Sequence, residues 1–378
     1  MRLAFLIFNY FPYGGLERNF LRITAEAVAR GHEVDVYTMG WQGERPGTGV
    51  TIHLLPGRGH TNHGQCLSFV EAMGKMGLRD HDLTVGFNRM PGLDLYYNAD
   101  VCYVADIRRR RGLLSRLTPR YRVLAAFERA VFAPEAKTNI MYLSEQEKRR
   151  YIKEYGTGEE RFHPLPPGID RQRILAAITP DAGLLLRQQL GLDMESRVLL
   201  AIGSDFVRKG VERTIRALAA LPAAERARTH LLVIGKGKAR PLLRLARRMG
   251  IPDHLHIIGA SDQVPRYLAG CDLLVHPAIS ENTGNVILEA LVAGRPVLAT
   301  DTCGYALHVT KAGAGRLVAG DPFCQAELDQ ALLAMVAKDQ HPLWRENARR
   351  YSEQTDLYSR PQVAVTIMEQ LAAKRCRD

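Results

Sequence analysis

The sequence predicts an α/β protein with two domains, each built around a doubly wound parallel sheet. Three observations lead to this fold class. Short apolar runs of strand length alternate with segments of helical periodicity along the chain. The length of 378 residues exceeds what a single hydrophobic core usually supports. A proline-rich stretch at residues 162–170 separates two such α/β series, because proline continues neither a sheet nor a helix.

The composition is that of a globular protein. Hydrophobic residues make up 46% of the chain and charged residues 24%, which excludes a disordered protein. No run approaches the roughly 20 apolar residues of a membrane span, and no signal-peptide cleavage pattern follows Met1. The six cysteines form no C-x-x-C pair, which favours reduced thiols. We therefore expect a cytoplasmic protein, and its net charge of +11 indicates an anionic partner.

The first domain opens with a strand and a glycine turn. An apolar run at residues 3–8 leads to Gly14 and Gly15, and residues 16–30 have helical spacing. Adjacent glycines let a ligand approach the backbone closely, and a helix N-terminus attracts phosphate. A plain tight turn is the alternative, because neither dinucleotide nor P-loop fingerprints occur here.

Further first-domain strands are expected at residues 34–39, 50–55, 83–87, 100–103 and 139–143. Asp100, at the edge of its strand, is either a capping residue or a site residue. Ser144 to Tyr155 reads as a helix with Glu147 at the capping-box position. A metal site is disfavoured, because dependable ligand spacing is lacking around His53, His60 and His63.

The segment 106–129 is rich in arginine. It contains only two acids against eight arginines, which are Arg108, Arg109, Arg110, Arg111, Arg116, Arg120, Arg122 and Arg129. Leucines are interleaved, and Thr118-Pro119 is a typical helix start. A basic helix with an apolar stripe fits an anionic membrane surface. A core-packing helix with a solvated basic face is the alternative, and RNA binding is disfavoured because aromatic residues are few.

The second domain shows the same alternation. Its expected strands are residues 198–202, 231–234, 254–258 and 272–275. Gly203 begins the turn after the first of these strands, and Arg208 and Lys209 follow. Since cations at the carboxyl end of a parallel strand lie on the ligand edge of the sheet, we predict that this pair binds a diphosphate.

The stretch from His276 to Ala290 combines a strand end, a polar loop and a helix start. The apolar segment that Gly284 opens runs to Ala293 and is stopped by Gly294. A phosphate would be attracted by the first N–H groups of this helix, near Gly284, Asn285 and Val286. Glu281 and Glu289 would then accept hydrogen bonds from hydroxyls of a sugar and a ribose. Taken alone, two glutamates eight residues apart are more often solvated helix charges.

Several motifs together resemble one family. They lie at residues 11–16, 87–94, 165–169, 203–210, 276–278, 281–289, 303–306 and 356–359. In this order, over nearly the whole chain, they resemble the bacterial lipopolysaccharide core glucosyltransferases, which are retaining family 4 glycosyltransferases of GT-B fold. The resemblance implies two Rossmann-like domains facing across a cleft. The first would comprise residues 1–165 and 358–378 with a returning helix at 360–375, and the second residues 166–357.

The resemblance also implies a reaction, in which glucose passes from UDP-glucose to the second heptose of the lipopolysaccharide inner core through an α-1,3 bond. It assigns catalytic roles to Glu281, facing the sugar, and to Asp100, near the acceptor. The implied donor-binding residues are Gly14, Gly15, Gly203, Arg208, Lys209, Asn282, Thr283, Gly284, Asn285, Val286 and Glu289. No cofactor or metal is expected, because cations and a helix dipole can stabilise the departing UDP. The tetrad Arg108–Arg111 would hold the enzyme on the inner face of the cytoplasmic membrane, and nucleic acid is not an expected partner.

Alternatives stay open at this point. Other family members carry Ala-Ala where this chain has Asn282-Thr283, so a UDP-N-acetylhexosamine is a second candidate donor. Retention is compatible with same-face attack through an oxocarbenium-like state or with a covalent intermediate on a carboxylate. A UDP-sugar epimerase of similar fold and a non-catalytic basic scaffold are the rival classes.

Overall fold

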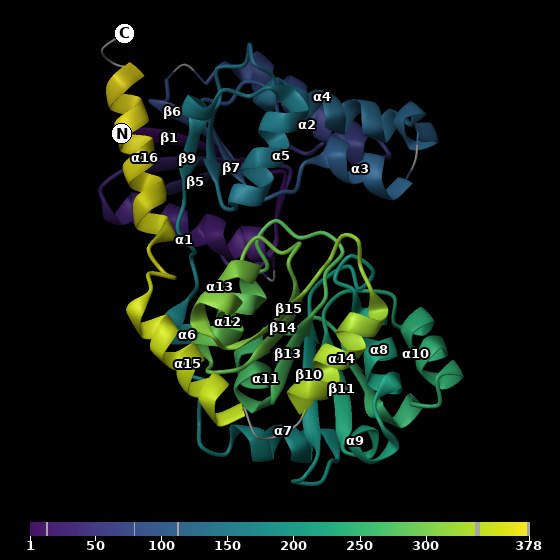
Figure 1. Ribbon diagram of the computed structural model, residues 1–378. Helices are drawn as coiled ribbons and strands as arrows, with labels where there is room; N and C mark the ends of the chain where they lie inside the picture. Colours follow the sequence, from purple (N-terminus) through teal and green to yellow (C-terminus); the bar gives the residue numbers. More distant parts are fainter. Residues whose placement is uncertain (13, 79, 112, 337–340, 376–378) are drawn as a thin grey trace. The chain divides into compact units, whose positions relative to one another are not determined.

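The computed structural model describes residues 1–12, 14–78, 80–111, 113–336 and 341–375, apart from the side chains of residues 110, 111 and 113 (Figure 1). The chain forms two compact units. Unit 1 comprises Met1–Gly168 and Ser359–Asp378, and unit 2 comprises Ile169–Tyr358. These boundaries fall slightly later in the chain than the ones expected from the sequence.

Unit 1 contains a seven-stranded parallel sheet in the order β5-β3-β1-β6-β7-β8-β9. Its strands are β1 (Arg2–Leu6), β3 (Glu33–Thr38), β5 (Val50–Leu54), β6 (Leu83–Gly86), β7 (Leu95–Asn98), β8 (Asn139–Tyr142) and β9 (Phe162–Pro164). A separate parallel pair joins β2 (Asn9–Tyr10) to β4 (Gly40–Trp41). The direction of winding reverses between β1 and β6, which is where doubly wound sheets bind ligands.

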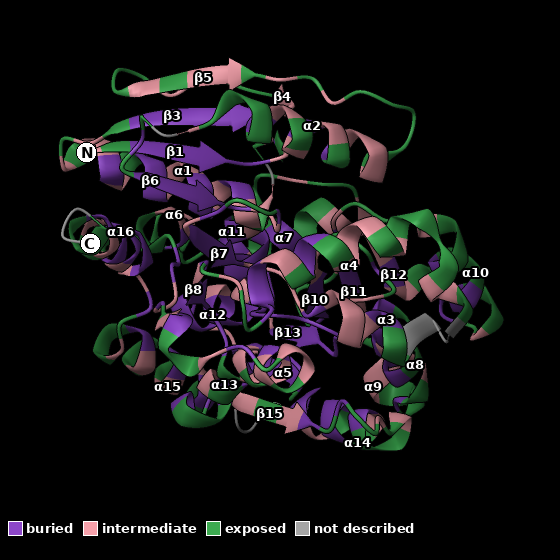
Figure 2. Ribbon diagram, turned by 90° about the horizontal axis from the view of Figure 1, so that it is seen from above, coloured by how far each residue is buried: buried purple, intermediate pink, exposed green. Residues whose placement is uncertain are grey.

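The helices of unit 1 cover this sheet. They are α1 (Gly15–Ala29), α2 (Asn62–Met76), α3 (Tyr103–Arg111), α4 (Pro119–Phe132), α5 (Glu145–Tyr155) and α16 (Arg360–Arg375), with 3-10 turns η1 (Leu113–Leu117) and η2 (Glu159–Arg161). The returning helix that the sequence predicts is α16, drawn in yellow in Figure 1, and it packs against α1 and β6. Central strands β1 and β6 are almost fully buried, whereas the edge strand β5 is half-exposed (Figure 2).

Three expectations for unit 1 are wrong. Residues 100–103 form no strand, because the backbone N–H groups of Tyr103 and Val104 donate to Glu128 at 2.7 and 3.0 Å and so begin α3. The capping box of α5 is absent, since Glu147 accepts instead from the backbone N–H of Cys102 at 3.0 Å. The proline-rich linker begins as a strand, β9, at the sheet edge, a position that tolerates proline.

Unit 2 contains a six-stranded parallel sheet in the order β12-β11-β10-β13-β14-β15. Its strands are β10 (Arg197–Ile202), β11 (Thr229–Ile234), β12 (Leu255–Ile258), β13 (Leu273–His276), β14 (Val297–Thr300) and β15 (Gly315–Val318). Counted along the chain this is the order 3-2-1-4-5-6 of dinucleotide-binding domains, with its switch point between β10 and β13. The predicted doubly wound parallel sheet is confirmed.

Helices lie on both faces of the unit 2 sheet (Figure 1). They are α6 (Arg171–Leu175), α7 (Ala182–Leu190), α8 (Val211–Ala220), α9 (Ala223–Ala227), α10 (Ala239–Arg248), α11 (Val264–Gly270), α12 (Asn285–Val292), α13 (Ala306–Ala312), α14 (Gln325–Val336) and α15 (His341–Gln354), with the 3-10 turn η3 (Pro252–His254). One core packs α8, α10 and α14 against the sheet, and the other packs α11, α12 and α13. Among the described residues, no helix is long and apolar enough to cross a membrane.

Candidate active site

The switch point of unit 2 brings two loops together. The loop after β10 carries Arg208 and Lys209, and the loop after β13 carries Glu281. The two loops are joined where the backbone N–H of Ile279 donates to the carbonyl of Arg208 at 2.8 Å. Gly210, with φ of 69°, lies so close to the Pro277 carbonyl that any Cβ would collide with it. Only glycine therefore allows this loop contact.

Arg208 and Lys209, the two residues predicted to bind the diphosphate, both contact the carboxylate of Glu281, which is predicted to face the sugar. Lys209 forms an ion pair with Glu281, and the Nη1 atom of Arg208 lies 3.4 Å from Oε2 of the same carboxylate. Arg208 also donates to the carbonyl of Ser280 at 3.2 Å. The Nε2 atom of His276, a residue to which the sequence assigned no role, lies 3.8 Å from Glu281 Oε2. The four side chains form one charged cluster, which we call the switch-point cluster.

The electrostatics of this cluster fix the charge of Glu281. Burial raises the pKa of the Glu281 carboxyl, but Lys209, His276 and Arg208 lower it more, so its pKa lies well below the ordinary value. Burial dominates at His276 and lowers its pKa. At neutral pH the cluster therefore presents an ionised carboxylate held by two cations, and one cationic charge is left to meet an anion.

The helix start next to the cluster has the predicted form. Gly284 is the N-cap of α12, with φ of 80°, and no side chain caps the first N–H groups of the helix. The side-chain oxygens of Ser280 and Asn285 are buried and have no hydrogen-bond partner among the described residues. Since buried polar atoms usually have a partner, these oxygens indicate a place for a ligand or water. Glu289 lies half-buried within α12.

The loop after β14 supports the loop after β13. The sequence analysis did not predict this support. The N–H of Tyr305 donates to the carbonyl of Thr283 at 2.8 Å, and Glu281 pairs with Cys303 in an isolated β-bridge. The hydroxyl groups of Thr300 and Thr302 both donate to the carbonyl of Ala278, at 2.7 and 2.8 Å. The motif at residues 303–306 was the only signal of this support.

The remaining predicted donor residues of unit 2 lie in the same two loops and in α12. Gly203, with φ of 147°, packs against the side chain of Lys209, where a Cβ would force that side chain to move. Asn282 and Thr283 are buried, and Val286 lies in the first turn of α12. Of the residues that the sequence assigned to the donor site in unit 2, the structure thus brings Gly203, Arg208 and Lys209 together with Glu281.

The other predicted site residues belong to unit 1. Gly14 is the N-cap of α1 and Gly15 its first residue. Glu17, which the sequence did not single out, folds its carboxylate back into the space where a Gly14 Cβ would be. Burial, with a smaller contribution from the charge of Asp100, raises the pKa of Glu17 to about 6. Asp100 lies 3.6 Å from the Arg89 guanidinium and accepts from the Tyr96 hydroxyl at 3.4 Å. Its side chain is 45% exposed.

Comparison with known proteins places the chain in a family. Residues 13–173 match "Glycosyltransferase Family 4", and residues 185–354 match "Glycosyl transferases group 1". The lipopolysaccharide glucosyltransferase WaaG of Escherichia coli (strain K12) is 43% identical over 373 residues, which cover 97% of this chain and 98% of that protein. The chain belongs to the WaaG family of glycosyltransferases. It is a hexosyltransferase, as the sequence predicted.

Solved structures agree with this membership of the WaaG family. A crystal structure of WaaG, described as a glycosyltransferase involved in lipopolysaccharide biosynthesis, has a TM-score of 0.90 and 42% identity, covering 97% of this chain and 99% of that one. Anabaena Alr3699/HepE in complex with UDP and glucose has a TM-score of 0.74 over 99% of this chain and 100% of its own, at 20% identity, and shows the fold alone. The predicted GT-B fold is confirmed.

Proposed function

We propose that this protein transfers glucose from UDP-glucose to the second heptose of the lipopolysaccharide inner core, forming an α-1,3 bond. The proposal is supported by the WaaG relative, whose name states a lipopolysaccharide glucosyltransferase and which matches nearly end to end. The observation that carries it is the switch-point cluster, in which Arg208 and Lys209 stand beside the uncapped N-terminus of α12. Such a site is suited to the diphosphate of a sugar nucleotide.

In the proposed reaction the bond between the sugar C1 and the diphosphate breaks, and a bond from C1 to the acceptor oxygen forms on the same face. The acceptor proton passes to an oxygen of the departing diphosphate. Arg208, Lys209 and the positive end of α12 would stabilise the charge that develops on UDP, so we propose that no metal is required. Glu281 would hold the two cations in place and face the sugar, and Asp100 would contact the acceptor side.

The test is a donor screen with the full-length protein and a purified acceptor that ends at the second heptose. We expect a single added hexose with UDP-glucose, an α-1,3 linkage by NMR, and undiminished activity in EDTA. A variant Lys209→Ala is the control for donor binding. Preferred transfer from a UDP-N-acetylhexosamine, or epimerisation of UDP-glucose without an acceptor, would contradict the proposal.

We also propose that the arginine-rich segment contacts an anionic membrane surface. In this proposal the predicted tetrad Arg108–Arg111 contributes less than the exposed residues that follow it. Arg108 pairs with Glu154, Arg109 lies 3.5 Å from Asp106, and the side chains of Arg110 and Arg111 lie outside the described part of the structure. Two leucines of η1 are strongly exposed, Leu114 at 81% and Leu117 at 64%.

The next turn of this segment adds exposed cations. Arg120 and Arg122 lie in α4, which Thr118 caps by accepting from the N–H of Tyr121 at 3.2 Å, as the sequence predicted. Exposed leucines beside exposed arginines suit the boundary between headgroups and acyl chains. Liposomes with anionic lipid should therefore bind the wild type, and a variant Leu114→Ser/Leu117→Ser/Arg120→Gln/Arg122→Gln should be released with unchanged UDP affinity. The variant Arg108→Gln/Arg109→Gln should be released less. Equal retention of all variants would contradict the membrane contact.

A further inference from the structure

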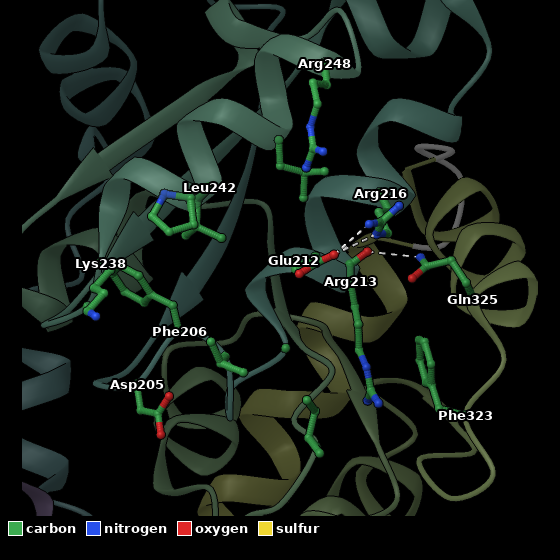
Figure 3. Close-up of a pocket in the computed structure, with 16 residues that line it drawn as sticks. Asp205, Phe206, Glu212, Arg213, Arg216, Lys238, Leu242, Arg248, Phe323 and Gln325 are labelled. Carbon is green, nitrogen blue, oxygen red and sulfur yellow. Dashed lines mark hydrogen bonds and ion pairs between the residues drawn. The ribbon is translucent and has the colours of Figure 1, made fainter. Parts of the chain in front are cut away.

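A groove of about 960 Å³ crosses the N-terminal end of α8 in unit 2 (Figure 3). Its walls come from the loop after β10, from α10 and from the segment before α14. The apolar part of its lining includes Phe206, Val207, Leu242, Ile279 and Phe323. The groove is therefore large enough for a small ligand and offers an apolar floor.

The groove is distinct from the switch-point cluster, although one loop borders both. Phe206 and Val207 line the groove, whereas Arg208 and Lys209 do not line it and instead contact Glu281. The loop from Phe206 to Gly210 thus separates the groove from the donor site. A ligand in the groove would occupy a second site.

The acids of the groove are already engaged. Glu212 binds Arg216 at 2.6 Å within α8 (Figure 3). Asp205 accepts from the backbone N–H of Arg208 at 3.2 Å. Two cations of the lining, Lys238 and Arg248, have no carboxylate partner among the described residues. The charge available to a ligand in the groove is therefore positive.

The positive charge continues along the outer face of α10. A second hollow of about 550 Å³ shares Pro241 and Arg248 with the groove and is also lined by Arg244 and Arg247. These arginines are exposed and, among the described residues, none pairs with a carboxylate. Exposed Leu243 directly precedes Arg244 in the sequence. An apolar floor therefore adjoins a row of uncompensated cations.

We propose that this groove and the adjoining face of α10 bind an amphipathic phosphate ester, whose apolar body lies along Phe206, Leu242 and Phe323 and whose phosphate meets Arg244 and Arg248, which are neighbours one turn apart on α10. Arginine and lysine bind phosphate through charge-assisted hydrogen bonds, and the apolar floor adds the burial of a hydrocarbon chain. A free phosphate would use the cations only. The inference does not depend on the proposed sugar donor or acceptor.

The test uses calorimetry on the full-length protein with dihexanoyl-phosphatidylglycerol below its critical micelle concentration, with inorganic phosphate, and with dihexanoyl-phosphatidylcholine. We expect the anionic lipid to bind at least about tenfold more tightly than either of the others, since it alone satisfies both halves of the site. The variant Arg244→Gln/Arg248→Gln should lose about tenfold or more in affinity for that lipid, and exposed Val207→Ser should weaken it to a smaller extent.

The matched control is Lys311→Gln/Arg316→Gln, which removes the same charge from exposed positions of unit 2 outside the groove. It should bind the lipid as the wild type does, and UDP affinity should be unchanged in all variants. Equal losses of lipid affinity in the two double variants would overturn the proposal, as would inorganic phosphate binding as tightly as the lipid. A parallel loss of UDP affinity in the groove variant would show that the groove belongs to the donor site, which would also overturn it.

Discussion

Lys209 and Glu281 form a nearly buried ion pair that joins the two loops at the switch point of unit 2, with side chains only 12% and 11% exposed. The residue expected to grip a diphosphate is thus held by the residue expected to face the sugar. Because Arg208 shares the same carboxylate, removal of any one partner changes the charge that the other two present. The first three predictions depend on this arrangement.

The double variant Arg208→Ala/Lys209→Ala should bind UDP about two orders of magnitude more weakly, or worse. Each lost charge-assisted contact is worth roughly 1.5–3 kcal/mol. Calorimetry with UDP measures the loss, and Arg216→Ala, which removes an α8 cation already paired with Glu212, is the control. Unchanged UDP affinity would place the pair outside the donor site.

Lys209→Met should destabilise unit 2 by about 3–5 kcal/mol, because it leaves the Glu281 carboxylate buried with weaker compensation. Adding Glu281→Gln to that variant should restore most of the loss. The chain has two tryptophans, one in each unit, so denaturant unfolding of unit 2 can be followed through Trp344 in a Trp41→Phe background. Simple addition of the two losses would show that the residues are not coupled.

The stability of unit 2 should depend on Glu281 in acid. The pKa of Glu281 is lowered in the folded state, so its contribution is present above the ordinary value of 4.5 and is lost as pH falls through the folded pKa. The difference in unfolding free energy between the wild type and Glu281→Gln should therefore shrink below a pH of about 4.5. A difference that stays constant from neutral pH to strongly acidic pH would contradict the lowered pKa.

Glu17 should make donor binding depend on pH. Its pKa is raised to about 6, so the carboxylate ionises between mildly acidic and neutral pH. If Gly14 and Gly15 approach the diphosphate as predicted, ionised Glu17 repels it. The donor KM of the wild type should then rise as pH increases through about 6, and Glu17→Gln should remove that rise.

The same shift has a consequence for stability. The stabilising contribution of Glu17 to unit 1 is fully present below its ordinary pKa of 4.5 and is lost as pH rises through about 6. At pH 8 the carboxylate is ionised in a buried place, so Glu17→Gln should raise the unfolding free energy of unit 1 by roughly 2 kcal/mol. Thermal or denaturant unfolding measures this gain. For the prediction on donor binding, the same pH dependence of the donor KM in the wild type and in Glu17→Gln would show that Glu17 has no effect on donor binding.

Asn282 should influence donor choice. It is buried beside Glu281, and a buried polar group left without its partner penalises the wrong substrate. If Asn282 meets a substituent at C2 or C3 of the sugar, Asn282→Ala should shift the ratio of kcat/KM between UDP-glucose and UDP-N-acetylglucosamine. An unchanged ratio would place the residue outside the sugar pocket, and Asn282→Asp is a second variant of similar size.

Features that depend on neighbouring residues could be predicted from the sequence. The strand, the polar loop and the helix that Gly284 starts are encoded within about twenty residues, and α12 begins where the local pattern indicates. The same holds for β10 and for the returning helix α16, whose bounds are those expected. In these places apolar periodicity and glycine positions are enough to define the type of element and where it begins.

Features that depend on distant partners could not be predicted. The contact of Arg208 with Glu281 joins residues 73 positions apart, and nothing in either local sequence selects that partner. The error at residues 100–103 has the same cause, because Glu128 in α4 supplies the acceptor that starts α3. Likewise Glu147, placed correctly for a local capping box, binds the more distant Cys102 N–H instead.

The position of α16 bears on how the protein is made. Residues 169–358 form unit 2 from one continuous stretch, whereas unit 1 needs the last residues of the chain to cover its sheet. Ala364, Val365 and Met368 are fully buried in the core of unit 1, and Arg360 donates to the carbonyl of Pro166 at 3.0 Å. On the ribosome, the first part of unit 1 must therefore expose an apolar surface until residues 360–375 have been synthesised, whereas unit 2 can already fold before then.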